Sequence, residues 1–220
     1  MFKHVHPYPP FIPHGTEKLI VGTLPPPRFT TGDLKPGDVD FCYGSRDGQL
    51  WLILSRIFDI DLIQENSKMA IQQRIDLLER LKIGVCDMVD YAFRDEINAS
   101  DYGLKDAHLR PLIPILKENI NINTLLFTGG NSKNGPEYFF RKHLNNFPEI
   151  KLKLVSDTVP RVHEFELNSR IVKTVSLTAP SGAANRAVGS MALYKKLKDE
   201  NPDFNTIDFR VMQYAPYFKD

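Results

Sequence analysis

Apolar positions at helical spacing are the first signal along the chain. Within 49–58, apolar residues recur every three or four positions and predict an amphipathic helix. A second such pattern follows Ser67, a residue type favoured at helix N-caps. Two later segments open at prolines, which suit the first helical position. The predicted helices are 49–58, 67–81, 111–118, 136–146 and 187–198.

Short apolar runs between turn residues predict strands that alternate with these helices. The predicted strands are 18–21, 83–89, 123–128, 151–156 and 171–178. Such alternation favours an α/β layer structure with a mainly parallel central sheet. In such sheets, ligands bind beyond the carboxyl ends of the strands. Four loops are expected to meet there, namely GTLPPP (22–27), CDMVDY (86–91), TGGNS (128–132) and TAPSGAANR (178–186).

Length and composition fit a single domain over 1–220. The chain is 42% hydrophobic and 25% charged, an ordinary globular balance. A formal net charge of +1 gives no global attraction to nucleic acid, although a local basic patch remains allowed. Prolines gather at 7–13 and 25–27, and residues 1–16 are expected to form an extended arm on the domain.

Several classes of protein and site are disfavoured. Two cysteines, Cys42 and Cys86, are too few for an iron–sulfur cluster within one chain. No histidine or cysteine spacing predicts a metal site. A signal peptide and an apolar stretch of membrane-spanning length are both missing, which favours a cytoplasmic protein.

Five segments, in this order, resemble motifs of the uracil-DNA glycosylase superfamily. They are HPYPPFIPHGTEKLIVGTLPP (6–26), YGSRDGQLWLIL (43–54), IGVCDMVDYAFRDE (83–96), LLFTGGNS (125–132) and LTAPSGAANR (177–186). The resemblance is closest to the hypoxanthine-DNA and mismatch-specific glycosylase branches. It implies a three-layer αβα sandwich that acts as a monomer, without a cofactor, in base excision repair. Such an enzyme flips a damaged base out of DNA and hydrolyses its N-glycosidic bond.

The resemblance assigns the loop at 180–186 to DNA binding. Its small residues let the backbone approach phosphates, and successive N–H groups can bind an anion. Ser181 is expected to donate to a phosphate or to the base, and Arg186 to neutralise a phosphate. The alternative is an ordinary strand-to-helix turn capped by Ser181 or Asn185. The assigned residues are Pro180, Ser181, Gly182, Ala183, Ala184, Asn185 and Arg186.

Water activation requires a polar group that this chain lacks at the usual position. The first motif proper is Gly22-Thr23-Leu24-Pro25. Many members of the superfamily carry Asp or Asn at its third position, where this chain has Leu24. The hypoxanthine branch also lacks a polar residue there, which directs attention to the next motif. Asp47 is the first candidate, and its alternative role is to cap the helix that follows. Ser45 is the second, since ungapped alignment on Trp51 places it at an asparagine of that branch.

The base-binding residues are expected in three loops. Phe41 or Tyr43 could stack on the flipped base, although core burial is the other reading, especially for Phe41. Thr128 stands where uracil-specific relatives carry an asparagine, so strict uracil specificity is not expected, and Asn131 could substitute. The first loop contributes Gly22, Thr23, Leu24 and Pro25.

One carboxylate lies inside an apolar run. Asp87 must be paired or hydrogen-bonded if the run is buried. It is expected to bind backbone N–H groups under the site or to pair with Arg94.

Hypoxanthine and uracil are the leading substrates under this resemblance. A binding module of the same fold without catalytic activity is the main alternative, and Leu24 favours it. A hydrolase of free nucleosides is the third possibility.

Overall fold

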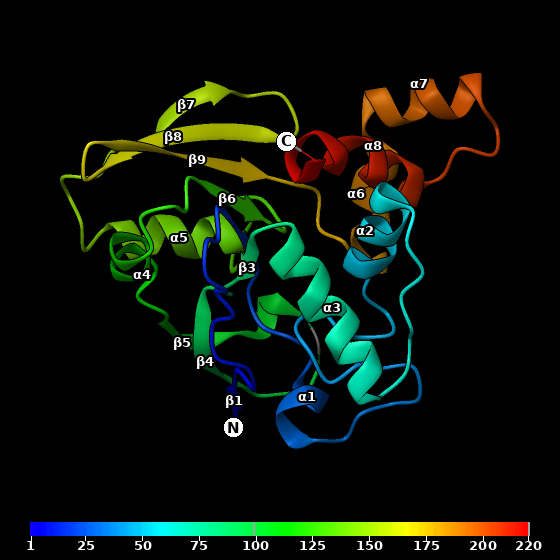
Figure 1. Ribbon diagram of the computed structural model, residues 1–220, viewed down its shortest axis with the longest axis horizontal. Helices are drawn as coiled ribbons and strands as arrows, with labels where there is room; N and C mark the ends of the chain where they lie inside the picture. Colours follow the sequence, from blue (N-terminus) through cyan, green and yellow to red (C-terminus); the bar gives the residue numbers. More distant parts are fainter. Residues whose placement is uncertain (99, 220) are drawn as a thin grey trace.

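Six strands form the main sheet of the computed structural model, which describes residues 1–98 and 100–219 (Figure 1). Their order is β3-β2-β6-β9-β8-β7. The strands β3, β2, β6 and β9 run parallel, while β8 and β7 are antiparallel additions at one edge. Their bounds are Ile83–Val85 (β3), Lys18–Val21 (β2), Thr124–Phe127 (β6), Arg170–Ser176 (β9), Arg161–Leu167 (β8) and Lys153–Ser156 (β7).

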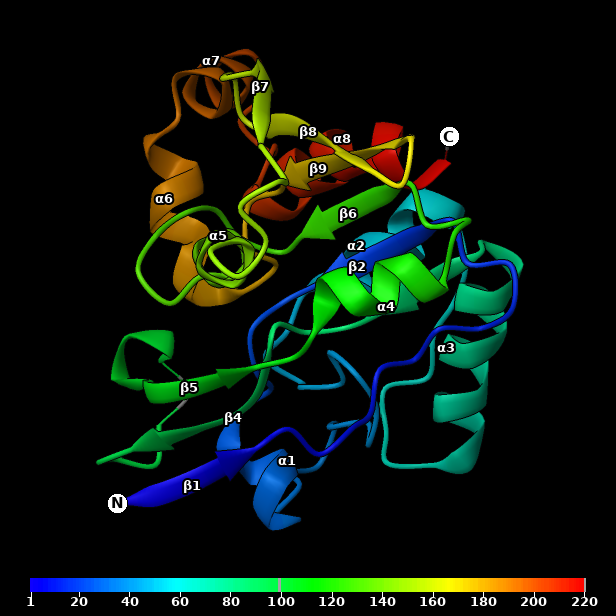
Figure 2. The same cartoon turned by 90° about the vertical axis from the view of Figure 1, so that its left-hand side faces the viewer.

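Helices cover both faces of this sheet. One layer contains α2 (Leu50–Phe58), α3 (Lys68–Arg80) and α8 (Thr206–Lys219). The other contains α4 (Leu112–Glu118) and α5 (Pro136–Leu144) (Figures 1 and 2). The predicted three-layer αβα sandwich with a mainly parallel sheet is confirmed.

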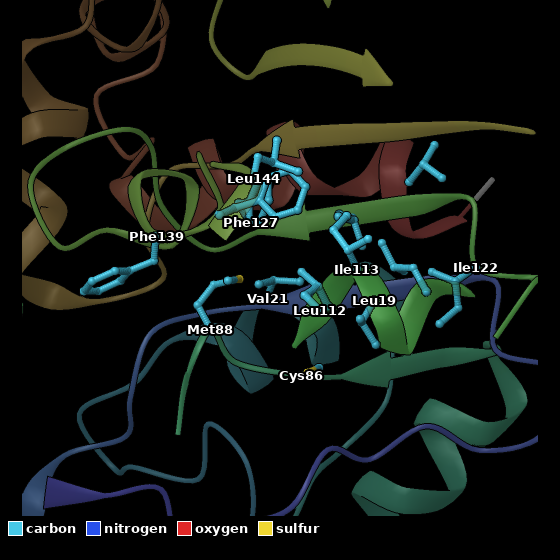
Figure 3. Close-up of a cluster of buried hydrophobic side chains, with 14 of the residues drawn as sticks. Leu19, Val21, Cys86, Met88, Leu112, Ile113, Ile122, Phe127, Phe139 and Leu144 are labelled. Atoms are coloured by element: carbon cyan, nitrogen blue, oxygen red, sulfur yellow. The ribbon is translucent and has the colours of Figure 1, made fainter. Parts of the chain in front are cut away.

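The alternation of side chains along the strands explains the two layers. Leu19 and Val21 of β2 pack on the side of α4 and α5, whereas Ile20 between them packs on the side of α2 and α3. Figure 3 shows Leu19 and Val21 beside Leu112 and Ile113 of α4. Because both faces are covered there, β2 and β6 are apolar from their second residue onward, as buried parallel strands usually are.

A second sheet holds the N-terminal segment. It has the order β1-β4-β5, with β1 (Phe2–Val5) antiparallel to β4 (Val89–Arg94) and β4 antiparallel to β5 (Lys105–Leu109) (Figure 2). The first residues of the arm expected over 1–16 form the paired strand β1. The single strand predicted over 83–89 is wrong. The chain leaves the main sheet at Val85 and enters the second sheet at Val89, so one run that is apolar except at Asp87 spans two strands.

Five further elements complete the described part of the fold. They are α1 (Pro27–Thr31), the 3-10 turns η1 (Asp101–Gly103) and η2 (Gly182–Ala184), α6 (Asn185–Ser190) and α7 (Ala192–Glu200). The continuous helix predicted over 187–198 is wrong, because Met191 is extended, with φ −70° and ψ 133°. Among the described residues, no helix is both long enough and apolar enough to cross a membrane.

Candidate active site

A cavity of about 480 Å³ lies beyond the carboxyl ends of the parallel strands. The structure brings the four predicted loops together around it, as the topology of a parallel sheet requires. Its size is within the range of small-molecule sites. The lining includes 23–26, 43–45, 47–50, 128–129 and 179–183, together with Asp87 and Asp101.

Asp87 is buried at this cavity, where the chain crosses from one sheet to the other. Its Oδ1 accepts hydrogen bonds from the Gly22 backbone N–H at 2.8 Å and from the Tyr43 hydroxyl at 3.0 Å. Its Oδ2 lies 2.9 Å from His6 Nε2. The expected bond to a backbone N–H is confirmed, and the alternative pairing with Arg94 is wrong. Arg94 instead donates to the ring of His4 and to the Ser100 carbonyl.

The hydrogen bonds around His6 and Asp87 indicate which nitrogen of His6 carries a proton. His6 Nδ1 accepts from the Tyr8 backbone N–H at 3.1 Å, so it carries no proton. Nε2 must then be the protonated nitrogen, and a neutral His6 donates to an ionised Asp87. Burial acts to raise the pKa of Asp87, but the bonds from His6, Tyr43 and Gly22 outweigh it and hold that pKa below its usual range.

Tyr43 adopts an unusual backbone conformation that directs its hydroxyl to Asp87. Its φ of 58° lies in the left-handed region, which non-glycine residues rarely occupy. Its hydroxyl also lies 3.2 Å from Thr128 Oγ1. Burial and the charge of Asp87 raise the pKa of Tyr43 well above its usual value, so the hydroxyl stays protonated and donates. Such local strain concentrates at functional sites.

Gly22 explains why the first motif begins with glycine. A Cβ at this position would lie 2.3 Å from the Tyr43 hydroxyl oxygen and 2.8 Å from Asp87 Oδ1. Only a residue without a side chain allows Tyr43 to approach the backbone so closely. Gly22 therefore lies behind Tyr43 and Asp87, which line the cavity, and does not line the cavity itself.

Arg28 organises the loop that carries the candidate residues Ser45 and Asp47. It binds Asp38 through Nε at 2.6 Å and Nη2 at 2.8 Å, and the same Nη2 donates to Ser45 Oγ at 2.8 Å. Burial opposes the ionisation of Asp38, but the bonds from Arg28 and from backbone N–H groups, including that of Arg46, lower its pKa to about 2.

Asp47 lines the cavity at its exposed rim. Its side chain is 68% exposed and lies 3.4 Å from Arg28 Nη2. The alternative role as a helix cap is wrong, because Gln49 is the N-cap residue of α2 and no side chain caps that end. The Gly48 and Gln49 backbone pairs with Ser181 and Pro180, so this loop is joined to the predicted DNA-binding loop.

The loop at 180–186 is held in place from behind by Arg210. This buried side chain donates to the carbonyls of Ala179 and Ser181 and to Asn185 Oδ1. Ser181 is the N-cap residue of η2 and Asn185 is its C-cap residue, but the Ser181 side chain makes no capping hydrogen bond, and α6 has Ala184 at its N-cap. Asn185 Oδ1 accepts from Arg210 and from the Thr206 hydroxyl, and a role of Asn185 in DNA binding stays a prediction.

The loop residues differ in exposure. Gly182 and Ala183 are exposed and line the cavity, and Ala184 lies beside them in η2. Pro180 is buried, while Arg186 is exposed.

Two predicted base contacts lie elsewhere. Phe41 is 8% exposed and packs against Phe11 and Trp51, so its burial in the core is the correct reading. Asn131 is exposed and does not line the cavity. Thr128 does line it, but its hydroxyl also contacts Tyr43 and the Val21 carbonyl.

Three residues of the site were missed in the sequence. His6 is the first residue of the quoted segment 6–26, and its place in that segment was the only indication in the sequence that it belongs to the site. Arg28 gave no sequence signal, since an arginine in a short helix is usually solvated. Asp101 lines the cavity from η1, which follows a strand that was not predicted.

Comparison with known proteins bears on the family of this chain. No protein-family model matches it. A hypoxanthine DNA glycosylase from Methanosarcina barkeri (strain Fusaro / DSM 804) is 32% identical over 126 residues, which are 57% of this chain and 71% of that protein. The chain belongs to the uracil-DNA glycosylase superfamily. Within this superfamily it resembles the hypoxanthine glycosylases.

The fold agrees with that membership. A solution NMR structure of a candidate uracil DNA glycosylase from Methanosarcina acetivorans matches over 100% of both chains, with a TM-score of 0.59 and 15% sequence identity. At this identity the match concerns the fold alone. Together the relatives indicate a DNA glycosylase of the uracil-DNA glycosylase fold.

Proposed function

We propose that this chain, acting as a monomer without a cofactor, excises a deaminated base from DNA. The base would be flipped into the cavity and released by hydrolysis of its N-glycosidic bond. The observation that carries the proposal is the cavity itself, which is bounded on one side by the first motif and on the other by exposed Gly182 and Ala183. This small-residue wall lets a DNA backbone approach the mouth.

Hypoxanthine is the substrate we favour over uracil. Thr128 offers one hydroxyl, which is shared with Tyr43, where a uracil-specific site needs two groups that read the base edge together. The flipped base would lie over the Tyr43 side chain, and hydroxyls of Ser45, Ser132 and Ser181 around the cavity could donate to its carbonyl oxygen.

The roles of Asp47 and Ser45 in water activation remain predictions. Both line the cavity, and both contact Arg28. An Asp47→Ala protein that folds and keeps full activity would refute the role of that carboxylate.

The test is a base-release assay on labelled oligonucleotides. The panel carries hypoxanthine, uracil, xanthine or mispaired thymine in single and double strands at low salt, and alkali reveals abasic sites. We expect release from hypoxanthine DNA. DNA binding without release from any substrate would favour the binding module, for which the apolar Leu24 is the supporting observation. Turnover of free inosine without action on DNA would favour the nucleoside hydrolase.

A further inference from the structure

We propose that Asp101 is the catalytic carboxylate that accepts the proton of the attacking water. This inference rests on the proposed glycosylase function and names a residue that no sequence motif indicates. Asp101 lines the cavity together with Thr23 and Leu24 of the first motif. Leu24, the residue after Thr23, occupies the motif position where many relatives carry the polar group. A carboxylate from another loop thus reaches the neighbourhood of that position.

The backbone around Asp101 is held by two other parts of the protein. Asn134 Nδ2 donates to the Asp101 carbonyl at 2.9 Å and to the Leu104 carbonyl at 3.1 Å. Arg94 donates to the Ser100 carbonyl directly before the turn. Asn134 is buried and itself has a left-handed φ of 62°. The loop that follows β6 and the strand β4 therefore fix the turn in place, as the preorganisation of a catalytic group requires.

The charges that face Asp101 suit a general base. Burial raises its pKa, the Arg94 guanidinium and the Thr23 hydroxyl lower it, and the Asp87 carboxylate raises it, with a net value of about 6. The group is therefore mostly ionised at neutral pH, yet it is a stronger proton acceptor than an ordinary carboxylate. A general base works best when its pKa lies near the working pH.

The other two carboxylates of the cavity suit this task less well. Asp87 already accepts hydrogen bonds from three donors, and its pKa is lowered. Asp47 is largely exposed and is paired with two arginines, Arg28 and Arg46. Asp101 lines the cavity, is partly buried and has a raised pKa.

The proposed step balances as a hydrolysis. The water oxygen forms a bond to the sugar C1′ while the C1′–N bond breaks, and the bonding electron pair leaves with the base. The water proton passes to Asp101, which ends the step as a neutral carboxylic acid. Loss of that proton to solvent and protonation of the departing base restore both groups.

The first measurement is the pH dependence of single-turnover base release by the wild-type protein and by Asp101→Asn. For the wild type, the rate is expected to rise with pH through about 6, because only the ionised carboxylate accepts a proton. The Asp101→Asn protein should be slower by about 10²–10⁴-fold and should lose this dependence. Asp101→Glu should recover part of the rate. Asp95→Asn is the matched control, since this exposed carboxylate in the same segment pairs with Lys105 and does not line the cavity.

A second variant keeps the test valid if Asp101→Asn fails to fold. Thr23→Val removes the hydroxyl that lowers the pKa of Asp101, so the pH-dependent rise should move to higher pH. A purely structural role for Thr23 would not move it. The inference is overturned if an active wild type shows no rise near pH 6, if its rate falls there, or if folded Asp101→Asn keeps the wild-type rate. A wild type that releases no base would instead overturn the proposed function.

Discussion

Replacing Gly22 by alanine should separate the Tyr43 hydroxyl from the Asp87 carboxylate at the floor of the cavity. The new Cβ would lie 2.3 Å from the Tyr43 hydroxyl oxygen, which is far inside contact distance. That hydroxyl has little room to move, because it is held between Asp87 and Thr128. The expected response is a displacement of the Tyr43 side chain and loss of its bond to Asp87.

The magnitude follows from two contributions. Overpacking by one methyl group costs about 1–3 kcal/mol. A lost hydrogen bond to a charged group costs about 1.5–3 kcal/mol. Gly22→Ala should therefore lower the free energy of unfolding by roughly 2.5–6 kcal/mol, and Tyr43→Phe by about 1.5–3 kcal/mol, since it loses only the bond.

The double variant makes this reasoning testable. The Tyr43→Phe change removes the hydroxyl oxygen that the new Cβ would contact. It also removes the hydrogen bond to Asp87 that Gly22→Ala is expected to break, so the double variant loses that bond only once. Gly22→Ala/Tyr43→Phe should be more stable than the sum of the single changes predicts by at least about 1.5 kcal/mol.

Urea unfolding of all four proteins gives the coupling energy, provided that their m-values agree. Additivity of the two changes within about 0.5 kcal/mol would refute the proposed clash. Gly182→Ala is a suitable control, because a Cβ there would meet no atom within 4 Å.

Two further predictions concern charge. The lowered pKa of Asp38 means that its pairing with Arg28 stabilises the folded protein above the ordinary value of 3.8, and this stability is lost as pH falls toward about 2. Asp38→Asn should therefore reduce stability at neutral pH and flatten that acid-dependent loss in urea titrations, and an unchanged pH profile would contradict the assignment. Arg186→Ala should reduce the slope of log binding constant against log salt concentration on DNA by about 1, whereas Lys82→Ala, at the opposite end of the strands, should leave the slope unchanged.

Local signals in the sequence predicted the elements that obey local rules. Ser67 was expected as an N-cap, and its hydroxyl does accept from the Ala70 backbone N–H at 3.2 Å. Pro136 opens α5 as expected. The strand predicted over 18–21 matches β2 in both bounds. A short, continuous apolar run is typical of a parallel strand that is buried on both faces.

The errors arose where tertiary structure decides the local conformation. The run 83–89 is apolar except at Asp87, and a single carboxylate does not mark the exchange of one sheet for another at Cys86–Met88. The helix α8 was not predicted, and Pro216 within it is a residue that usually ends a helix. The strand β8 was also missed, and it is an antiparallel addition that the βα alternation does not require.

The candidate site was likewise predicted in part. The loops that line it were predicted, because strand order places them at one edge of the sheet. The partners of Asp87 were predicted only in part. Its backbone donor is in the first motif, but the donor His6 is 81 positions away and is brought close by a sheet that was not anticipated.

The pairing of distant segments at the cavity has a consequence for folding. The contacts that define it join His6 to Asp87, Tyr43 to Thr128 and Gly48 to Ser181, with 81 positions between the first pair and 85 between the second. Contacts of such separation form slowly, because the loops between them must close first. The cavity should therefore be completed late, after the main sheet has formed. A chain still being synthesised would have no complete cavity until residues 179–183 had emerged, and a nick in any of these loops would divide the site between two fragments.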